Sequence, residues 1–131
     1  LIMAKDERNI YTIQDDSSMG EVKIADEVVA IIAALAATEV EGVASMAGNI
    51  TNELISRLGM KNLSKGVRIE VDEEDKVQVY VTINIAYGYA IPEVSRNVQE
   101  KIKSAIENMT GLEVSGVNVR IADVDMKGAA E

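Results

Sequence analysis

Aliphatic and polar residues alternate strictly along two neighbouring stretches of the chain, 67–71 and 77–85. Four acidic residues, 72–75, separate the two stretches. A period of two that places aliphatic side chains on one face is typical of strands that cover a core on one side. The sequence therefore predicts an antiparallel hairpin with an acidic turn.

A different spacing follows Pro92. Aliphatic residues recur at steps of three and four through 91–109, and polar or charged residues occupy most of the other positions. This is the period of an α-helix with one buried face. Pro92 is suited to the first helical turn, and Thr110 with Gly111 is suited to the end. We predict a long amphipathic helix between them.

An almost continuous aliphatic run over 28–37 predicts a second helix of another kind. Asp26 is a suitable cap for this helix, and Glu27 would lie in the favourable first turn. Because apolar side chains surround most of the helix, we expect it to be covered on more than one side or to form an interface. The run is about half as long as the ~20 residues that a membrane-spanning helix needs.

Shorter elements complete the predicted order. Val114 falls out of phase with the alternation that begins at Val117, so we expect a bulge at Ser115-Gly116. In chain order, the remaining elements are a short strand at Tyr11–Ile13, a strand at Glu21–Ile24, a strand or extended turn at Glu41–Ala44, a short helix at Ile50–Leu58 that Gly59 ends, and a last strand around Val117–Ile121.

The order of these elements, β-α-β-α-β-β-α-β, predicts an α+β fold. We expect a two-layer sandwich in which a mostly antiparallel sheet carries two long helices on one face. The expected organisation is a flexible N-terminal arm at 1–19, a single α+β domain at 20–125 and a C-terminal tail at 126–131. The opposite face of the sheet is expected to be wet or bound to a partner, and it carries Arg68, Glu70, Gln78, Tyr80, Thr82, Asn84 and Arg120.

The composition restricts the chemistry that the chain can perform. None of the 131 residues is histidine or cysteine. This removes the usual base at neutral pH, the thiol nucleophile, and the imidazole and thiolate metal ligands. The remaining catalytic candidates are Lys65 or Lys101 as a base and the carboxylates of Glu70 and Asp72, a pair that any exposed strand would place on one face. We therefore predict no catalytic residue, no cofactor and no metal ligand.

The net charge of −9 restricts the partners. Such a chain is repelled by phosphate backbones and by anionic lipid head groups, so we expect neither nucleic-acid binding nor direct membrane insertion. The absence of cysteine fits a reducing cytosol, and we expect a cytoplasmic location. The acidic residues 72–75 lack the spacing of a calcium loop, and their charges are suited to a solvated hairpin tip that resists aggregation.

Tyrosines are the best candidates for contact with a partner, because they are the only aromatic residues in the chain. Tyr87 and Tyr89 flank Gly88 between the hairpin and the long helix. They form either an aromatic contact patch or, the interpretation that we favour, a tight bend at Gly88 with the rings over the helix end.

Tyr80, on the polar sheet face, invites comparison with sheets that stack RNA bases on aromatic side chains. Those sheets carry several aromatics in a basic surround, whereas this chain offers one tyrosine and a modest basic cluster at Lys61, Lys65 and Arg68. RNA binding is therefore the last of our hypotheses. The residues that we single out as partner contacts are Arg68, Tyr80, Tyr87, Tyr89 and Arg120.

Three segments, taken together, resemble the alkaline shock protein family, the envelope stress response proteins of Gram-positive bacteria. The order and spacing of the segments carry the resemblance, which spans roughly Gly20 to Asp125. The segments are Gly20–Val29 leading into Val40–Val43, then Lys65–Val71, then Val79–Val94 continuing through Gln99–Ile102, Met109–Leu112 and Val117–Val119.

The resemblance implies a small cytoplasmic protein of cell-envelope homeostasis, without established enzymatic activity, that binds other proteins or self-associates into a homo-oligomer. It also implies that the protein can lie beside the membrane through an anchored partner. Some family members are encoded near carboxylase genes of fatty-acid biosynthesis. Regulation of such an acyl-lipid enzyme is therefore the alternative function. No site residue is transferred with the resemblance.

Overall fold

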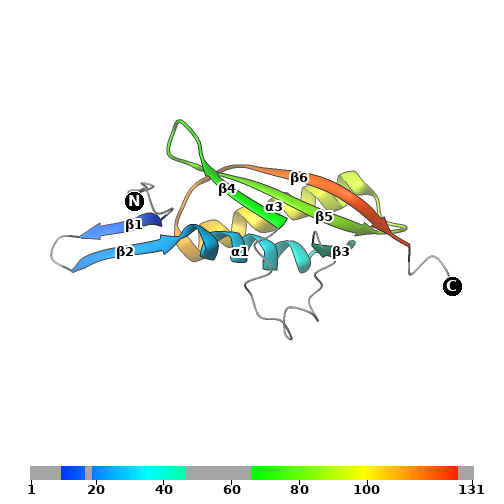
Figure 1. The fold of residues 1–131 in the computed structure, drawn as a ribbon, viewed down its shortest axis with the longest axis horizontal. Helices are drawn as coiled ribbons and strands as arrows, with labels where there is room; N and C mark the ends of the chain where they lie inside the picture. The colour runs from blue at the N-terminus through cyan, green and yellow to red at the C-terminus, as the bar shows by residue number, and fades with distance from the viewer. Residues whose placement is uncertain (1–9, 17–18, 47–65, 127–131) are drawn as a thin grey trace.

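A computed structural model describes residues 10–16, 19–46 and 66–126, and it shows an α+β fold of two layers (Figure 1). The predicted fold class, with its mostly antiparallel sheet, is confirmed. The helix expected at 50–58 and the end of the chain beyond 126 lie outside the described residues. In chain order the elements are β1 (Ile10–Asp16), β2 (Gly20–Ala25), α1 (Asp26–Thr38), β3 (Val43–Met46), β4 (Val67–Val71), β5 (Val77–Ala86), α3 (Ile91–Thr110) and β6 (Val114–Asp125).

β5 is the central strand of a four-stranded sheet. β4 pairs antiparallel with its first half, β3 pairs antiparallel with its second half, and β6 runs parallel along its whole length. Because β6 occupies one edge of β5, β3 and β4 share the other edge. The predicted hairpin of β4 and β5 is thus confirmed, and its register places Val67 opposite Val81 and Val71 opposite Val77.

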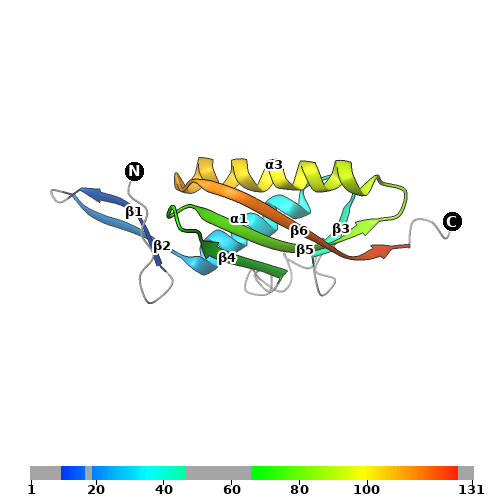
Figure 2. The ribbon, with the colours of Figure 1, turned by 90° about the horizontal axis from the view of Figure 1, so that it is seen from above.

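Both long helices cover one face of the sheet (Figure 2). α1 contacts α3, β3 and β4, so the expectation that it is covered on more than one side is confirmed. Alanines such as Ala33 and Ala37 are fully buried along α1. The core between the layers is almost entirely aliphatic, and fully burying one such side chain contributes about 1.5–3 kcal/mol. None of the helices in the described part of the chain has the length and hydrophobicity needed to cross a bilayer.

β6 contains two irregularities. Val77 pairs with Val114 and Gln78 pairs with Gly116, so Ser115 is an extra residue and the predicted bulge is confirmed. The register shifts again beyond Ile121, where Ala122 is extra. Each extra residue moves the following side chains to the other face of the sheet.

Side chains occupy several backbone groups of β6 that do not pair with β5. The amide of Val114 donates to Glu107 Oε2 at 3.0 Å, and Gln99 Nε2 on α3 donates to the carbonyl of Val117 at 3.0 Å. The amide of Val124 donates to Asp123 Oδ1 at 2.8 Å. The outer edge of β6 is therefore partly capped by side chains, most of them from α3.

The strand expected at Tyr11–Ile13 is confirmed and is longer than predicted, because residues 10–16 form β1 and pair antiparallel with β2. Tyr11 is fully buried beside the start of α1 and holds the hairpin to the body. Burial, together with the neighbouring carboxylate of Asp26, raises the pKa of the Tyr11 phenol far above its ordinary value. Asp26 is the first residue of α1 and not its cap, a position that Ala25 holds without a side-chain hydrogen bond.

Asn84 was expected on the open polar face, and that expectation is wrong. Its side chain is buried, with 7% of its surface exposed. The amide donates to Ser45 Oγ at 2.9 Å and to the carbonyl of Met46 at 3.4 Å. Asn84 is therefore an internal hydrogen-bonding group that joins β5 to β3, because a buried amide must satisfy its donors inside the protein.

Candidate functional site

The loop between β5 and α3 holds two of the predicted contact residues. Gly88 has a φ of 99°, the left-handed conformation that glycine adopts without steric cost, and the chain turns there as predicted. The Tyr89 amide donates to the Ala86 carbonyl at 3.4 Å within this turn. The turn leaves 60% of the Tyr87 surface and 43% of the Tyr89 surface exposed.

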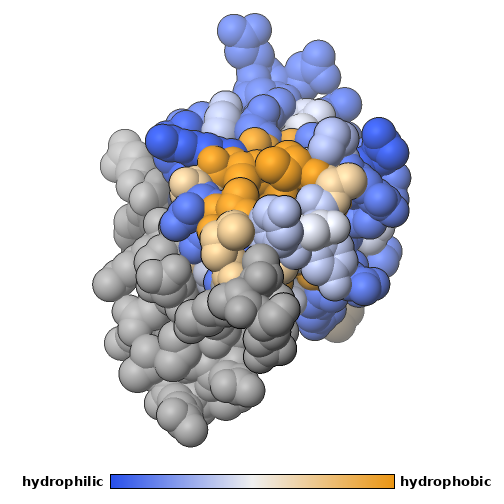
Figure 3. Space-filling view, turned by 90° about the vertical axis from the view of Figure 1, so that its right-hand side faces the viewer, coloured by the Kyte–Doolittle hydropathy of each residue, from blue (hydrophilic) through white to orange (hydrophobic). Residues whose placement is uncertain are grey.

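The end of β6 lies beside this loop, because the Tyr87 amide donates to the Asp125 carbonyl at 2.9 Å. Figure 3 looks onto this end of the molecule and shows a hydrophobic area with hydrophilic residues above it and to its right. A gathering of exposed apolar side chains is a recognised mark of an interaction site. We call the five exposed side chains here the end patch: Tyr87, Tyr89, Ile91, Val124 and Met126.

Tyr89 is anchored from below by a close backbone approach. Gly42 has a φ of 98°, and a Cβ built on it would lie 2.6 Å from Val94 Cγ2 and 2.9 Å from Tyr89 Cδ1. The Tyr89 hydroxyl also donates to Glu41 Oε1 at 3.4 Å. The interpretation that the rings cover the helix end therefore fits Tyr89, which packs near Val94 of α3. It does not fit the more exposed Tyr87.

Acidic residues are frequent in the chain segments that form the end patch. The segments that form it, 40–43, 86–94 and 121–126, contain four acidic residues and no lysine or arginine. Since like charges add over short distances, these segments contribute a negative charge to the patch region. The acidic residues are Glu41, Glu93, Asp123 and Asp125.

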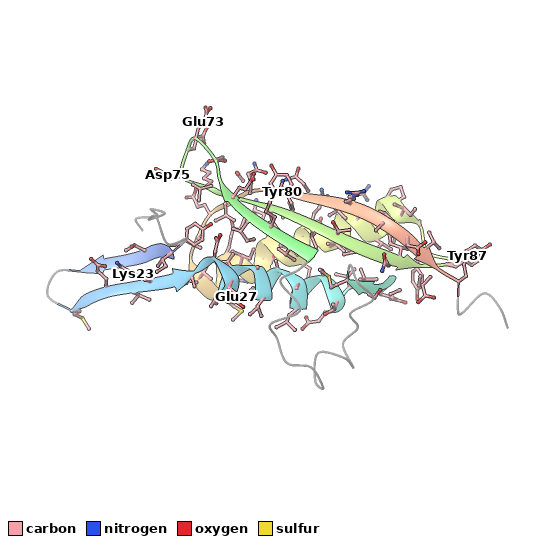
Figure 4. All side chains as sticks on the ribbon, in the orientation of Figure 1. Lys23, Glu27, Glu73, Asp75, Tyr80 and Tyr87 are labelled. Carbon is pink, nitrogen blue, oxygen red and sulfur yellow. The ribbon has the colours of Figure 1, made fainter. Side chains whose placement is uncertain are left out.

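The open face of the sheet holds the other predicted contact residues. Figure 4 shows Tyr80 along the sheet and Tyr87 at its far end, so the structure does not bring the two sets together. The Arg68 guanidinium lies 4.3 Å from the centroid of the Tyr80 ring and forms an ion pair with Glu70 at 3.3 Å. A base that stacked on Tyr80 would have to displace Arg68. Arg120 is exposed further along β6, where it pairs with Thr82 of β5.

Polar side chains on the open face bind one another. Asn118 Nδ2 donates to Gln78 Oε1 at 3.0 Å and to the carbonyl of Val79 at 3.1 Å. Gln78 Nε2 donates to Ser115 Oγ at 3.0 Å. These three side chains are therefore hydrogen-bonded to one another or to the backbone of the sheet.

The acidic turn at 72–75 serves its own hairpin. Asp72 Oδ1 accepts the backbone amides of Glu74 and Lys76 at 2.9 and 3.0 Å. The hydroxyl of Ser115 and these amides hold the pKa of Asp72 below its ordinary value. Glu73 and Asp75 project from this tip (Figure 4). Within the described ranges, no three carboxylates converge closely enough to hold a metal ion.

The catalytic candidates are used for other purposes. Lys101 forms an exposed ion pair with Glu39 at 3.5 Å, and Glu70 pairs with Arg68. Asp72 stabilises its turn, while Lys65 lies outside the described residues together with Lys61.

The aliphatic members of the end patch were not singled out from the sequence as exposed residues: Ile91, Val124 and Met126. A signal for Val124 was present, because it stands one position out of phase with the alternation of 117–121. The same kind of phase break predicted the bulge at Ser115, and here it marks the second bulge at Ala122. Ile91 was assigned to the buried face of its helix, although it lies at the exposed first turn.

A family model described as the alkaline shock protein 23 family, with cell envelope-related function, matches residues 14–126. The chain belongs to this family. The resemblance noted from the three segments is thereby confirmed, and a role related to the cell envelope comes with it. No solved structure matches the chain.

Several bacterial relatives cover most of the chain. The uncharacterized protein YqhY of Bacillus subtilis (strain 168) is 35% identical over 127 residues, which is 97% of this chain and 93% of that protein. The uncharacterized protein YloU of the same strain is 32% identical over 115 residues, 86% of this chain and 95% of that protein. A stress response regulator gls24 homolog of Streptococcus pyogenes serotype M3 (strain MGAS315) is 28% identical over 111 residues, 82% of this chain and 60% of that protein.

Proposed function

We propose that this protein is a non-enzymatic cytoplasmic component of envelope stress response and homeostasis that acts by binding other proteins. The end patch is the observation that carries the proposal. It gathers, at one end of the molecule, five of the nine large exposed hydrophobic side chains of the described residues. Such a concentration of apolar and aromatic surface is suited to protein contact.

The use of the charged side chains supports a role without catalysis. A catalytic base or acid needs a neighbour that shifts its pKa and a pocket that excludes water. Among the described residues, the candidate groups lie in exposed ion pairs or stabilise a turn. Their arrangement is that of a solvated surface.

The acidic character of the chain supports an indirect link to the envelope. A net charge of −9 disfavours contact with anionic lipid head groups. We therefore place the protein in the cytoplasm, with any approach to the membrane made through a partner protein. A carboxylase of fatty-acid synthesis would be one identifiable partner.

Affinity purification from the native host, with a Tyr87→Ser/Val124→Ser double variant beside the wild type, tests this function. We expect a specific set of proteins with the wild type and a loss of that set with the variant. Deletion of the gene should sensitise cells to envelope stress, and only the wild type should restore resistance. Met109→Ser, at an exposed methionine at the far end of α3, is the matched control and should behave as the wild type.

Full complementation by the double variant, with an unchanged set of recovered proteins, would show that the end patch does not carry the function. A thermal unfolding curve of the purified variant checks that the two substitutions leave the fold intact.

A further inference from the structure

We propose that the end patch binds a segment of another protein that is both apolar and positively charged. This inference rests on the proposed function and names the chemistry of the partner.

The end patch is held in place by the fold before any partner arrives. Three backbone segments meet there: the Ala86 amide donates to the Gly42 carbonyl at 2.9 Å, and the Tyr87 amide donates to the Asp125 carbonyl at 2.9 Å. Tyr89 is fixed over Gly42. A surface that is ordered in the free protein loses little conformational entropy on binding.

The segments that form the end patch are acidic. Four carboxylates and no basic residue lie in the three segments that form the patch. Asp123 and Glu41 each accept one hydrogen bond from a neutral donor, which leaves their negative charge in place. The basic residues nearest along the described chain are Arg96 and Arg120, and Lys127 follows outside the described residues.

Within the described segments of the patch, the N-terminus of α3 favours an anion. A helix N-terminus is equivalent to roughly half a positive charge. Glu93, in the first turn of α3, already opposes it with a full negative charge. The balance at the patch is therefore negative, and Lys or Arg side chains of a partner could also pack on the tyrosine rings.

Charge also separates this occupant from the alternatives. A second copy of the chain that docked through the same patch would bring its own carboxylates against these, which disfavours a symmetric contact. An anionic lipid surface is disfavoured for the same reason. A cationic and apolar segment is complementary both to the apolar side chains of the end patch and to the acidic residues of its segments.

Three short synthetic peptides test the proposal against the full-length protein by fluorescence anisotropy and by NMR chemical-shift mapping. The first is amphipathic and built from leucine and lysine, the second has glutamate in place of each lysine, and the third has serine in place of each leucine. We expect the leucine–lysine peptide to bind at least about tenfold more tightly than either of the others, with shifts centred on the end patch.

Matched variants separate binding at the patch from general attraction to an acidic protein. Glu93→Gln with Asp123→Asn removes two charges at the patch, and Glu73→Gln with Asp75→Asn removes two at the hairpin tip. The first pair should weaken the leucine–lysine peptide several-fold, and the second should have a much smaller effect, because attraction between exposed charges falls off within about 10 Å. Val124→Ser should weaken it without changing the net charge.

Equal effects of the two charge variants, or equal binding of the lysine and glutamate peptides, would overturn the proposal. So would patch-dependent dimers in light scattering that the peptide does not displace, because the occupant would then be a second copy. If the peptides fail while Tyr87→Ser/Val124→Ser still loses its host partners, the proposed function stands and only the chemistry assigned here is wrong.

Discussion

Tyr80 and Tyr87 belong to one stretch of chain, yet their surroundings are opposite. Tyr80 lies on the open sheet face, where Arg68 covers its ring and the neighbouring polar side chains bind one another. Tyr87 lies on the end patch, with most of its surface exposed among aliphatic side chains. A tyrosine ring on the surface can thus be covered by a neighbouring side chain, or it can be left exposed and available for contact. The neighbouring side chains determine whether the ring is covered or exposed, and most of those neighbours are distant in sequence.

The glycine beneath the end patch should give the largest effect. Gly42→Ala places a Cβ against Val94 and Tyr89 at a positive φ, so it should lower the free energy of unfolding by about 2–4 kcal/mol. Gly88→Ala has a φ of 99° with nothing within 4 Å of the new Cβ, and should cost about 1–2 kcal/mol. Urea denaturation measures both. Equal losses would mean that Gly42 does not support the patch through close packing.

The buried amide between β3 and β5 should come next. Asn84→Ala leaves Ser45 and Met46 without their donor in a buried place, at a cost of about 1–3 kcal/mol. Asn118→Ala removes a similar amide from the open face, where water can replace its bonds, so we expect roughly 0.5 kcal/mol. If the Asn118 variant is the less stable of the two in denaturant titrations, the distinction between the inner and open polar groups fails.

Substitution of Tyr80 should mainly affect stability, and substitution of Tyr87 should mainly affect binding of the peptide. Tyr80→Ser loses its contacts with Arg68 and across the strands, and should cost about 1 kcal/mol of stability while leaving affinity for the leucine–lysine peptide unchanged. Tyr87→Ser should weaken the peptide about tenfold and leave the unfolding midpoint nearly unchanged. Paired unfolding and anisotropy measurements on the two variants decide the matter. If both variants changed stability and peptide affinity to the same extent, the distinction between the two tyrosines would be wrong.

The smallest effect concerns the acidic turn. The pKa of Asp72 is lower in the folded protein than the value of about 4 expected for the unfolded chain. Its carboxylate therefore stabilises the fold above pH 4, and this contribution is lost as the pH falls through the folded pKa. Asp72→Asn should lower the urea midpoint slightly at pH 7, and the difference from the wild type should vanish below the folded pKa. If the difference in urea midpoint between Asp72→Asn and the wild type were the same at every pH, the charge of Asp72 would not be its cause.

Local patterns were enough to predict β4, β5 and α3, because a period of two or of three and four is contained within one segment. The same holds for the bulge at Ser115, which a single break of phase reveals. β1 could not be predicted at full length, since its residues form a strand through pairing with β2 and through the burial of Tyr11. Asn84 was expected on a wet or partner-bound face because of its phase in the alternation, whereas it is buried and hydrogen-bonded to β3.

The end patch was predicted in part, through Tyr87 and Tyr89. Its aliphatic members could not be assigned from the sequence, because Val124 joins the loop only after a second bulge and through a backbone contact between Tyr87 and Asp125. Arg68, Tyr80 and Arg120 were chosen for residue type and strand position. Type alone does not reveal that Arg68 and Tyr80 are already engaged with each other.

The capped edge of β6 bears on how such a protein behaves when it is crowded. An exposed strand edge lets copies of a protein pair through their main-chain hydrogen bonds. Such pairing is unspecific and leads to aggregation. Here Glu107, Gln99 and Asp123 have already taken three of those main-chain groups. Strand pairing between copies along β6 would then be disfavoured, even at high concentration. Association would depend instead on contacts between side chains, which can be specific and reversible.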